Sequence, residues 1–150
     1  LNLAGKFGDK SLEDKVKNQQ AWLRVNELGF LNRQQVNEVL AKSKAGLVTL
    51  YPVINYMDAL PVKMFEYMAA GIPVIASNFP LWHEIVEGNQ CGICVNPLDT
   101  NAISKAIQYF VENSIDAERM GKNGRRAVEE KYNWLIEEKK LLRLYEGLKL

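Results

Sequence analysis

Two continuous apolar runs with a short helix between them limit what this chain can fold into. Residues 45–51 (AGLVTLY) and 72–77 (IPVIAS) are rich in apolar and β-branched residues without strict alternation, which is typical of strands covered on both faces. Residues 61–70 between them have a helical pattern and end at Gly71, a common residue just past a helix. Strands alternating with helices predict a mostly parallel sheet with helices on both faces.

The rest of the chain continues this alternation. We expect further strands at residues 1–5, 21–25 and 91–95, and helices at 11–20, after residue 32, at 80–86 and from 100 to the end. Ser11 and Asn32 are the expected N-caps, and Pro61 is expected at a first helical position. Residues 52–60 are expected to form a loop.

The predicted fold class is therefore α/β, with a doubly wound sheet in a single domain over residues 1–150. The pattern of the last helix, from about residue 133 to 148, predicts a docking face formed by Trp134, Leu141, Leu142 and Tyr145.

Composition bounds the class of protein. With 150 residues, 47% of them hydrophobic and a net charge of +1, the chain suits one globular core and has no overall field for nucleic acid or an anionic membrane. We therefore expect no nucleic-acid partner. No run reaches the roughly 18 apolar residues of a membrane span, and no signal peptide is visible.

Cys91 and Cys94 form a C-x-x-C pattern, which occurs in redox pairs and half metal sites. Against that, the chain has no further cysteine and a single histidine, His83. Because the flanking residues are apolar, we interpret both thiols as small residues of a buried strand. His83 is interpreted as a surface or capping residue.

The charged residues around the helix at 61–70 are the candidate site. Asp58 lies in the loop that enters the helix, and Lys63 and Glu66 share one side of it as i, i+3 neighbours. Free amides at a helix N-terminus and nearby charges commonly hold anions at the mouth of a sheet. The alternative is an exposed ion pair between Lys63 and Glu66.

The stretch DALPVKMFEYMAAGIPVIAS resembles the donor site of group 1 (family four) glycosyltransferases: an acid, seven residues, a glutamate, and then G-x-P-V-I-A-S. The segments LNLAG, LRVNELGFLNRQQVNEVLAKSKAGLVTLYP, HEIVEGNQCGICVNPLD and MGKNGRRAVEEKYNW also resemble that family. The resemblance implies a Rossmann-like donor-binding domain, part of a GT-B fold, and transfer of a sugar from a nucleotide-diphosphate sugar with retention of configuration. It implies no metal and no other cofactor.

The same resemblance assigns roles to the candidate residues. Glu66 would bind the ribose hydroxyls, and Asp58 would be the catalytic-site acid near the donor sugar, although the family usually has glutamate there. The amides of Val62 and Lys63 would bind the diphosphate, reinforced by the Lys63 ammonium. Pro61 stands where the family commonly has glycine, and so removes one amide.

Leu60 and Phe30 complete the donor-binding candidates. Leu60 lies in the loop before the helix, and Phe30 follows the Gly29 turn, which in this family borders the nucleotide base. The alternative for Phe30 is a hydrophobic staple before the helix capped by Asn32. Glu84 matches a downstream glutamate of the family, with an expected structural role at a helix terminus.

The resemblance also indicates what the chain lacks. The family's phosphate-clamping arginine and lysine and its acceptor-binding N-terminal domain would lie upstream, so we expect the fragment alone to be inactive. The expected setting is cytoplasmic, in bacterial capsule, exopolysaccharide or lipopolysaccharide assembly, with a lipid-linked saccharide as a candidate acceptor. Peripheral association with the inner face of the membrane stays open. The alternative function is that of a non-catalytic nucleotide-sugar-binding or assembly module.

Overall fold

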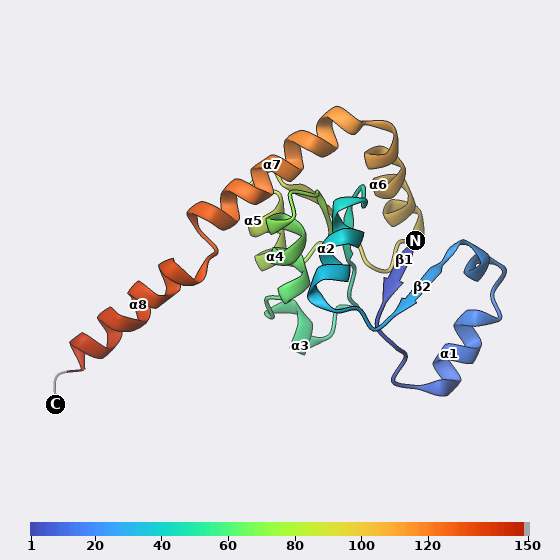
Figure 1. The fold of residues 1–150 in the computed structure, drawn as a ribbon, viewed down its shortest axis with the longest axis horizontal. Helices are drawn as coiled ribbons and strands as arrows, with labels where there is room; N and C mark the ends of the chain where they lie inside the picture. Colours follow the sequence, from blue (N-terminus) through green and yellow to red (C-terminus); the bar gives the residue numbers. More distant parts are fainter. Residues whose placement is uncertain (149–150) are drawn as a thin grey trace. The chain divides into compact units, whose positions relative to one another are not determined.

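The chain divides into two compact units, Leu1–Lys42 and Ser43–Leu150 (Figure 1). The computed structural model describes residues 1–148. Its strands are all paired in parallel, as expected, but they lie in a two-stranded and a three-stranded sheet rather than in one. The assignment of residues 1–150 to a single domain stays a prediction.

The first unit holds two strands and three helical segments: β1 (Asn2–Ala4), α1 (Lys10–Lys17), the 3₁₀ helix η1 (Gln20–Arg24), β2 (Asn26–Gly29) and α2 (Arg33–Ala41). Strand β1 pairs with β2. The side chain of Lys17 joins α1 to the following segments, because its ammonium contacts Glu27 at 2.7 Å and lies 5.6 Å from the centre of the Trp22 ring. Every residue of this unit is at least partly exposed, so these contacts of Lys17 lie at the surface.

Two predictions in this unit are wrong. Asp9, not Ser11, caps α1, because its carboxylate accepts hydrogen bonds from the amides of Ser11 and Leu12 at 2.7 and 3.2 Å. The predicted strand at residues 21–25 is the 3₁₀ helix η1, and the strand starts at Asn26. The ring of Trp22, within this 3₁₀ helix, packs against that of Phe7, with 5.9 Å between the ring centres.

The second unit contains β3 (Gly46–Val48), α3 (Ile54–Met57), α4 (Val62–Ala69), β4 (Val74–Ser77), α5 (Pro80–Val86), β5 (Gly92–Val95), α6 (Thr100–Glu112), α7 (Ser114–Glu130) and α8 (Trp134–Gly147). Its sheet has the order β3-β4-β5. The strands are shorter than predicted, Pro61 is the N-cap of α4 rather than its first residue, and the expected loop contains α3.

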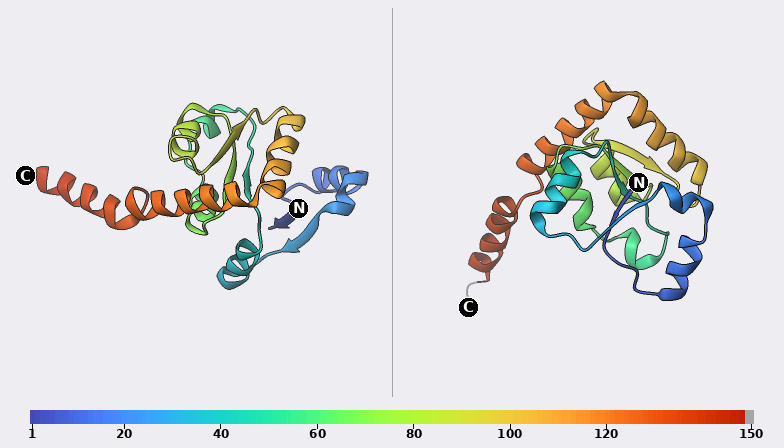
Figure 2. Two further views of the ribbon diagram at one scale, coloured as in Figure 1. Left: turned by 90° about the horizontal axis from the view of Figure 1, so that it is seen from above. Right: turned by 45° about the vertical axis from the view of Figure 1, so that its right-hand side comes forward.

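Helices cover both faces of this sheet, which confirms the α/β class (Figures 1 and 2). On one face Val74 and Ala76 of β4 pack with residues of α4, α5 and the end of α7. On the other face Ile75 packs with Ala106 and Phe110 of α6. Because every residue of β4 is buried, the residues from 72 to 76 are all apolar, and Ser77 is the one polar side chain of the run.

The last helix, α8, does not dock as predicted. The structure buries none of its residues, and its Trp134, Leu142 and Tyr145 are 67%, 55% and 68% exposed. The helix continues beyond α7 and away from the sheet (Figures 1 and 2). The apolar pattern in the sequence identified one face of this helix but not a surface against which that face packs.

Helix α7 approaches the end of α4 closely, and glycines stand at the crossing. A Cβ atom at Gly121 would lie 2.0 Å from the carbonyl oxygen of Gly71, and one at Gly124 would lie 3.3 Å from the Cα of Met68. Arg125 adds a hydrogen bond of 2.7 Å from its Nη1 to the carbonyl of Ala69. The crossing therefore fixes α4 on the sheet.

We predict that Gly121→Ala destabilises the protein by about 1–3 kcal/mol, because the added methyl forces backbone atoms apart. Urea unfolding should show a lower midpoint for this variant. Gly147→Ala is the matched control, since a Cβ there meets nothing within 4 Å. Equal midpoints for the two variants would contradict the close crossing.

Candidate functional site

The candidate residues of the second unit gather where β3 and β4 end. The segment from Tyr51 to Leu60 is exposed throughout, and within it α3 ends at its C-cap Asp58. Three residues separate Asp58 from the first residue of α4. The loop acid and the start of α4 thus lie at the carboxyl edge of a parallel sheet, the usual position for a ligand in such folds.

Helix α4 begins with unused hydrogen-bond donors. Its N-cap, Pro61, has no N–H and gives no side-chain cap. The first backbone bond of the helix runs from the amide of Met64 to the carbonyl of Pro61, at 3.0 Å. Within residues 1–148 no acceptor takes the amides of Val62 and Lys63, so these two N–H groups are available to an anion.

Lys63 and Glu66 do not form the ion pair that was the alternative to a ligand site. Both side chains are exposed, and no salt bridge of the described chain includes either of them. Met64 and Met68 point into the core and fix the helix rotation. The structure therefore leaves one ammonium and one carboxylate of α4 open to solvent near the free amides.

Two buried side chains, which sequence reasoning did not assign, hold this region in place. The Ser77 hydroxyl accepts a hydrogen bond from the Leu50 amide and donates one to the Leu50 carbonyl, each at 2.8 Å. The indole N–H of Trp82, fully buried, donates to the carbonyl of Ala59 at 2.6 Å. Ser77 thus fixes the start of the loop and Trp82 its end, beside Asp58.

The two apolar candidates are exposed. Leu60 is 53% exposed and lies in the loop before α4. Phe30, 75% exposed, belongs to the other compact unit, where the Lys6 ammonium lies 5.5 Å from its ring centre. The staple alternative for Phe30 does not suit this exposure, and the residue that directly precedes the N-cap Asn32 is Leu31. Asn32 does form the predicted cap, in a capping box with Gln35.

The remaining polar candidates have surface or packing positions. His83 is exposed and its Nε2 lies 3.2 Å from a carboxylate oxygen of Glu87, which confirms its interpretation as a surface residue. Glu87 also accepts a hydrogen bond from the Cys94 amide at 2.9 Å. Glu84 is exposed, and the structure records no side-chain hydrogen bond for it at a helix terminus.

The cysteines behave as packing residues, in agreement with their interpretation from the sequence. Both are free thiols; Cys91 is buried and Cys94 is half-buried. Burial raises the pKa of Cys91 to about 11. Burial, reinforced by the charge of Glu87, raises the pKa of Cys94 to about 12. Both stay protonated at neutral pH and so lack the thiolate character of a redox or metal-binding pair.

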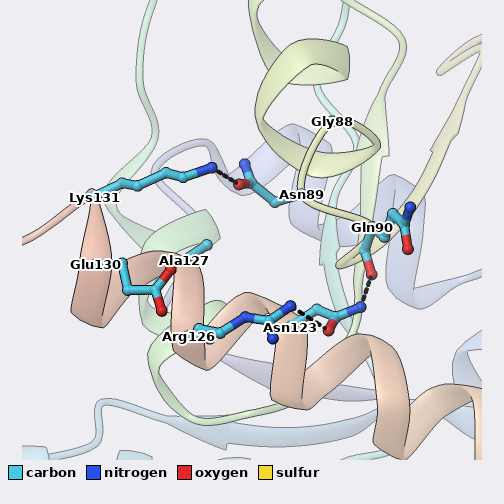
Figure 3. Close-up of a pocket in the computed structure, with 8 residues that line it drawn as sticks. All are labelled: Gly88, Asn89, Gln90, Asn123, Arg126, Ala127, Glu130 and Lys131. Atoms are coloured by element: carbon cyan, nitrogen blue, oxygen red, sulfur yellow. Dashed lines mark hydrogen bonds between the residues drawn. The ribbon is translucent and has the colours of Figure 1, made fainter.

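Among residues 1–148, no group of three or more His, Cys, Asp and Glu side chains is arranged to hold a metal ion. None of the helices described is long and apolar enough to cross a membrane. A cavity of about 390 Å³ is present in the second unit, but none of the predicted site residues lines it (Figure 3).

Comparison with known proteins identifies relatives for nearly the whole chain. Residues 1–127 match the family described as "Glycosyl transferases group 1". A curated relative, the amylovoran biosynthesis glycosyltransferase AmsK of Erwinia amylovora, is 26% identical over 95% of this chain and 33% of its own length. The chain spans between 23% and 38% of the length of the curated relatives it matches.

Solved structures match equally broadly. Sucrose-phosphate synthase from Thermosynechococcus elongatus superposes with a TM-score of 0.83 at 26% identity, covering 98% of this chain and 38% of that one. Anabaena Alr3699/HepE in complex with UDP superposes with a TM-score of 0.82, covering 98% of this chain and 40% of that one. At 19% identity the second match is evidence for the fold alone.

We predict that Trp82→Phe loosens the segment from residue 58 to 61. The variant keeps an aromatic ring beside Phe79, whose centre lies 4.7 Å from that of Trp82. It leaves the Ala59 carbonyl without its donor, which lowers the stability of this contact by about 1–3 kcal/mol. Hydrogen exchange followed by mass spectrometry should detect faster exchange in peptides covering 58–63. Trp134→Phe, at an exposed position, should leave them unchanged. Identical exchange in both variants would mean that this hydrogen bond does not hold the loop.

Proposed function

The chain belongs to the group 1 glycosyltransferases, and we propose that it supplies the donor-binding part of an enzyme that transfers a sugar from a nucleotide-diphosphate sugar to an acceptor. This family acts with retention of configuration. The proposal rests on the start of α4. There the free amides of Val62 and Lys63 and the exposed Lys63 ammonium lie between Asp58 and Glu66 in the sequence. The fold, part of a GT-B C-terminal domain, supports it.

The proposed roles follow the chemistry of each group. The amides of Val62 and Lys63 and the Lys63 ammonium bind the diphosphate, because the N-terminus of a helix favours negative charge. Glu66, for which no salt bridge is recorded within residues 1–148, accepts hydrogen bonds from the ribose hydroxyls. Asp58 contacts the donor sugar, and Trp82 keeps it in position through the Ala59 carbonyl.

Leu60 and Phe30 are the proposed contacts of the nucleotide base. Leu60 and Phe30 each offer an exposed apolar surface on which a flat base could pack. We propose no metal ion and no other cofactor for the reaction, so that the neutralisation of the diphosphate rests on the protein's own cations and amides.

The pathway, the acceptor and the cellular location are proposed by analogy with relatives. Amylovoran biosynthesis glycosyltransferase AmsK suggests a bacterial surface polysaccharide pathway, with a lipid-linked saccharide as acceptor and a cytoplasmic location at the inner face of the cell membrane. The acceptor-binding domain lies outside residues 1–150 in this proposal, and these residues alone are not expected to transfer sugar.

A second candidate function is a non-catalytic nucleotide-sugar-binding or assembly module. The observation that favours it is Asp58 itself, which is one methylene shorter than the glutamate usual at this position. Such a module would use the same α4 amides to bind a nucleotide sugar but would not turn it over.

We predict that Lys63→Ala weakens nucleotide-diphosphate binding about tenfold at low salt, because it removes a charge-assisted contact. Thermal shift of the intact protein against uridine, guanosine and adenosine diphosphate sugars first identifies the donor, and calorimetry then compares the variants. Lys105→Ala, an exposed lysine of α6, is the control. Unchanged affinity in Lys63→Ala would remove Lys63 from the site, and stabilisation by none of the nucleotides would refute the function.

A turnover assay separates the two candidate functions. For an enzyme, we predict that the intact wild-type protein transfers sugar, that Asp58→Glu keeps this activity, and that Asp58→Ala lowers it about 10- to 100-fold through the lost contact with the sugar. For a binding module, the wild-type protein binds the donor without turnover. Activity that arises only in Asp58→Glu would also favour the module.

A further inference from the structure

A polar cavity lies at the edge of the three-stranded sheet opposite to the proposed donor site. Its volume is about 390 Å³, and it is lined by the turn Gly88, Asn89 and Gln90 and by residues at the end of α7 (Figure 3). This turn precedes β5, whereas α4 starts beyond the end of β3. In a parallel sheet those positions belong to opposite edges, so the cavity is separate from the proposed donor site.

The cations of this cavity differ from the others of α7. Arg119, Lys122 and Arg125 each pair with a carboxylate three or four residues away. In the part of the chain that the structure describes, Arg126 and Lys131 have no such partner. Each is instead a donor to a neutral amide: the guanidinium of Arg126 to Asn123 at 3.2 Å, and the ammonium of Lys131 to Asn89 at 2.7 Å.

The two amides that hold these cations are themselves anchored. The Nδ2 of Asn89 donates to the Ile85 carbonyl at 2.7 Å and to the Tyr132 hydroxyl at 3.2 Å. The Nδ2 of Asn123 donates to the carbonyl of Gln90 at 3.0 Å (Figure 3). Both cationic side chains are therefore oriented before any ligand arrives, which lowers the entropic cost of binding.

The cavity also contains an acceptor. Glu130 lines it and, within residues 1–148, forms no salt bridge, although Arg126 lies four residues before it on α7. A carboxylate in that position accepts hydrogen bonds from hydroxyl groups, while a guanidinium and an ammonium are the usual partners of a phosphate. The lining thus offers both cations for a phosphate and an acceptor for hydroxyl groups.

We propose that this cavity is a binding site for a small phosphorylated polyol. Arg126 and Lys131 bind the phosphate oxygens, and Glu130 accepts hydrogen bonds from the hydroxyls. The site is independent of the proposed function, which concerns the other edge of the sheet.

Calorimetry on the intact protein tests the proposal with three probes: sorbitol 6-phosphate, sorbitol and inorganic phosphate. We expect saturable binding of sorbitol 6-phosphate, a Kd for inorganic phosphate at least fivefold higher, and no binding of sorbitol. Absence of saturable binding at moderate salt would overturn the site. Equal Kd values for sorbitol 6-phosphate and inorganic phosphate would overturn the role given to Glu130.

Variants locate the binding. Arg126→Gln and Lys131→Gln should each raise the Kd for sorbitol 6-phosphate at least tenfold. Arg126→Lys, which keeps the charge but not the planar fork, should give an intermediate value. Glu130→Gln should raise the Kd for sorbitol 6-phosphate and not that for inorganic phosphate.

Two controls complete the test. Lys122→Gln removes a cation from the same helix outside the cavity, where it pairs with Glu118, and should leave the Kd unchanged. Lys63→Ala should also leave it unchanged; a loss there would assign the phosphate to the start of α4 and overturn the proposal. Urea midpoints without ligand should agree among all variants, since each changes an exposed side chain.

Discussion

The hydrogen bonds between the Ser77 hydroxyl and the backbone of Leu50 join the end of the most buried strand to the start of the loop that carries the candidate site. Strand β4 ends there, and its backbone pairs with β3 on one side and β5 on the other. Ser77 is the only buried polar residue among residues 1–148. Because its hydroxyl bonds both the amide and the carbonyl of Leu50, an apolar substitute would leave these two backbone groups without partners. The loop's other end is held in the same way, by the indole of Trp82.

The arrangement of α4 follows from the same strand. Met64 and Met68 pack against Val74 and Ala76 of β4 and the neighbouring core residues, and Gly121 allows α7 to close over the end of the helix. The helix is therefore clamped along its inner face and at its C-terminus. Its N-terminus and outer face carry the free amides, Lys63 and Glu66, so the candidate groups belong to a helix whose position is set by packing.

The start of α4 and the cavity beside α7 differ in how their charged side chains are oriented. At the start of α4 the side chains of Lys63, Asp58 and Glu66 are exposed and have no side-chain partner among residues 1–148. In the cavity beside α7 the cations are oriented by Asn89 and Asn123, which are fixed to backbone carbonyls. Among residues 1–148 neither region contains an ion pair, whereas Arg119, Lys122 and Arg125 of α7 are each paired with a carboxylate.

The sequence alone determined the α/β class, the candidate residues on α4, the end of that helix at Gly71 and the packing role of Cys91 and Cys94. These follow from local rules, because apolar runs, glycine after a helix and i, i+3 spacing act within a few residues. Only the tertiary structure showed that Ser77 and Trp82 hold the two ends of the loop, that Gln20–Arg24 forms a 3₁₀ helix in place of the predicted strand, and that α8 stays exposed. Each of these depends on partners distant in sequence or on a covering surface, and a local pattern contains no information about which atoms meet across the fold.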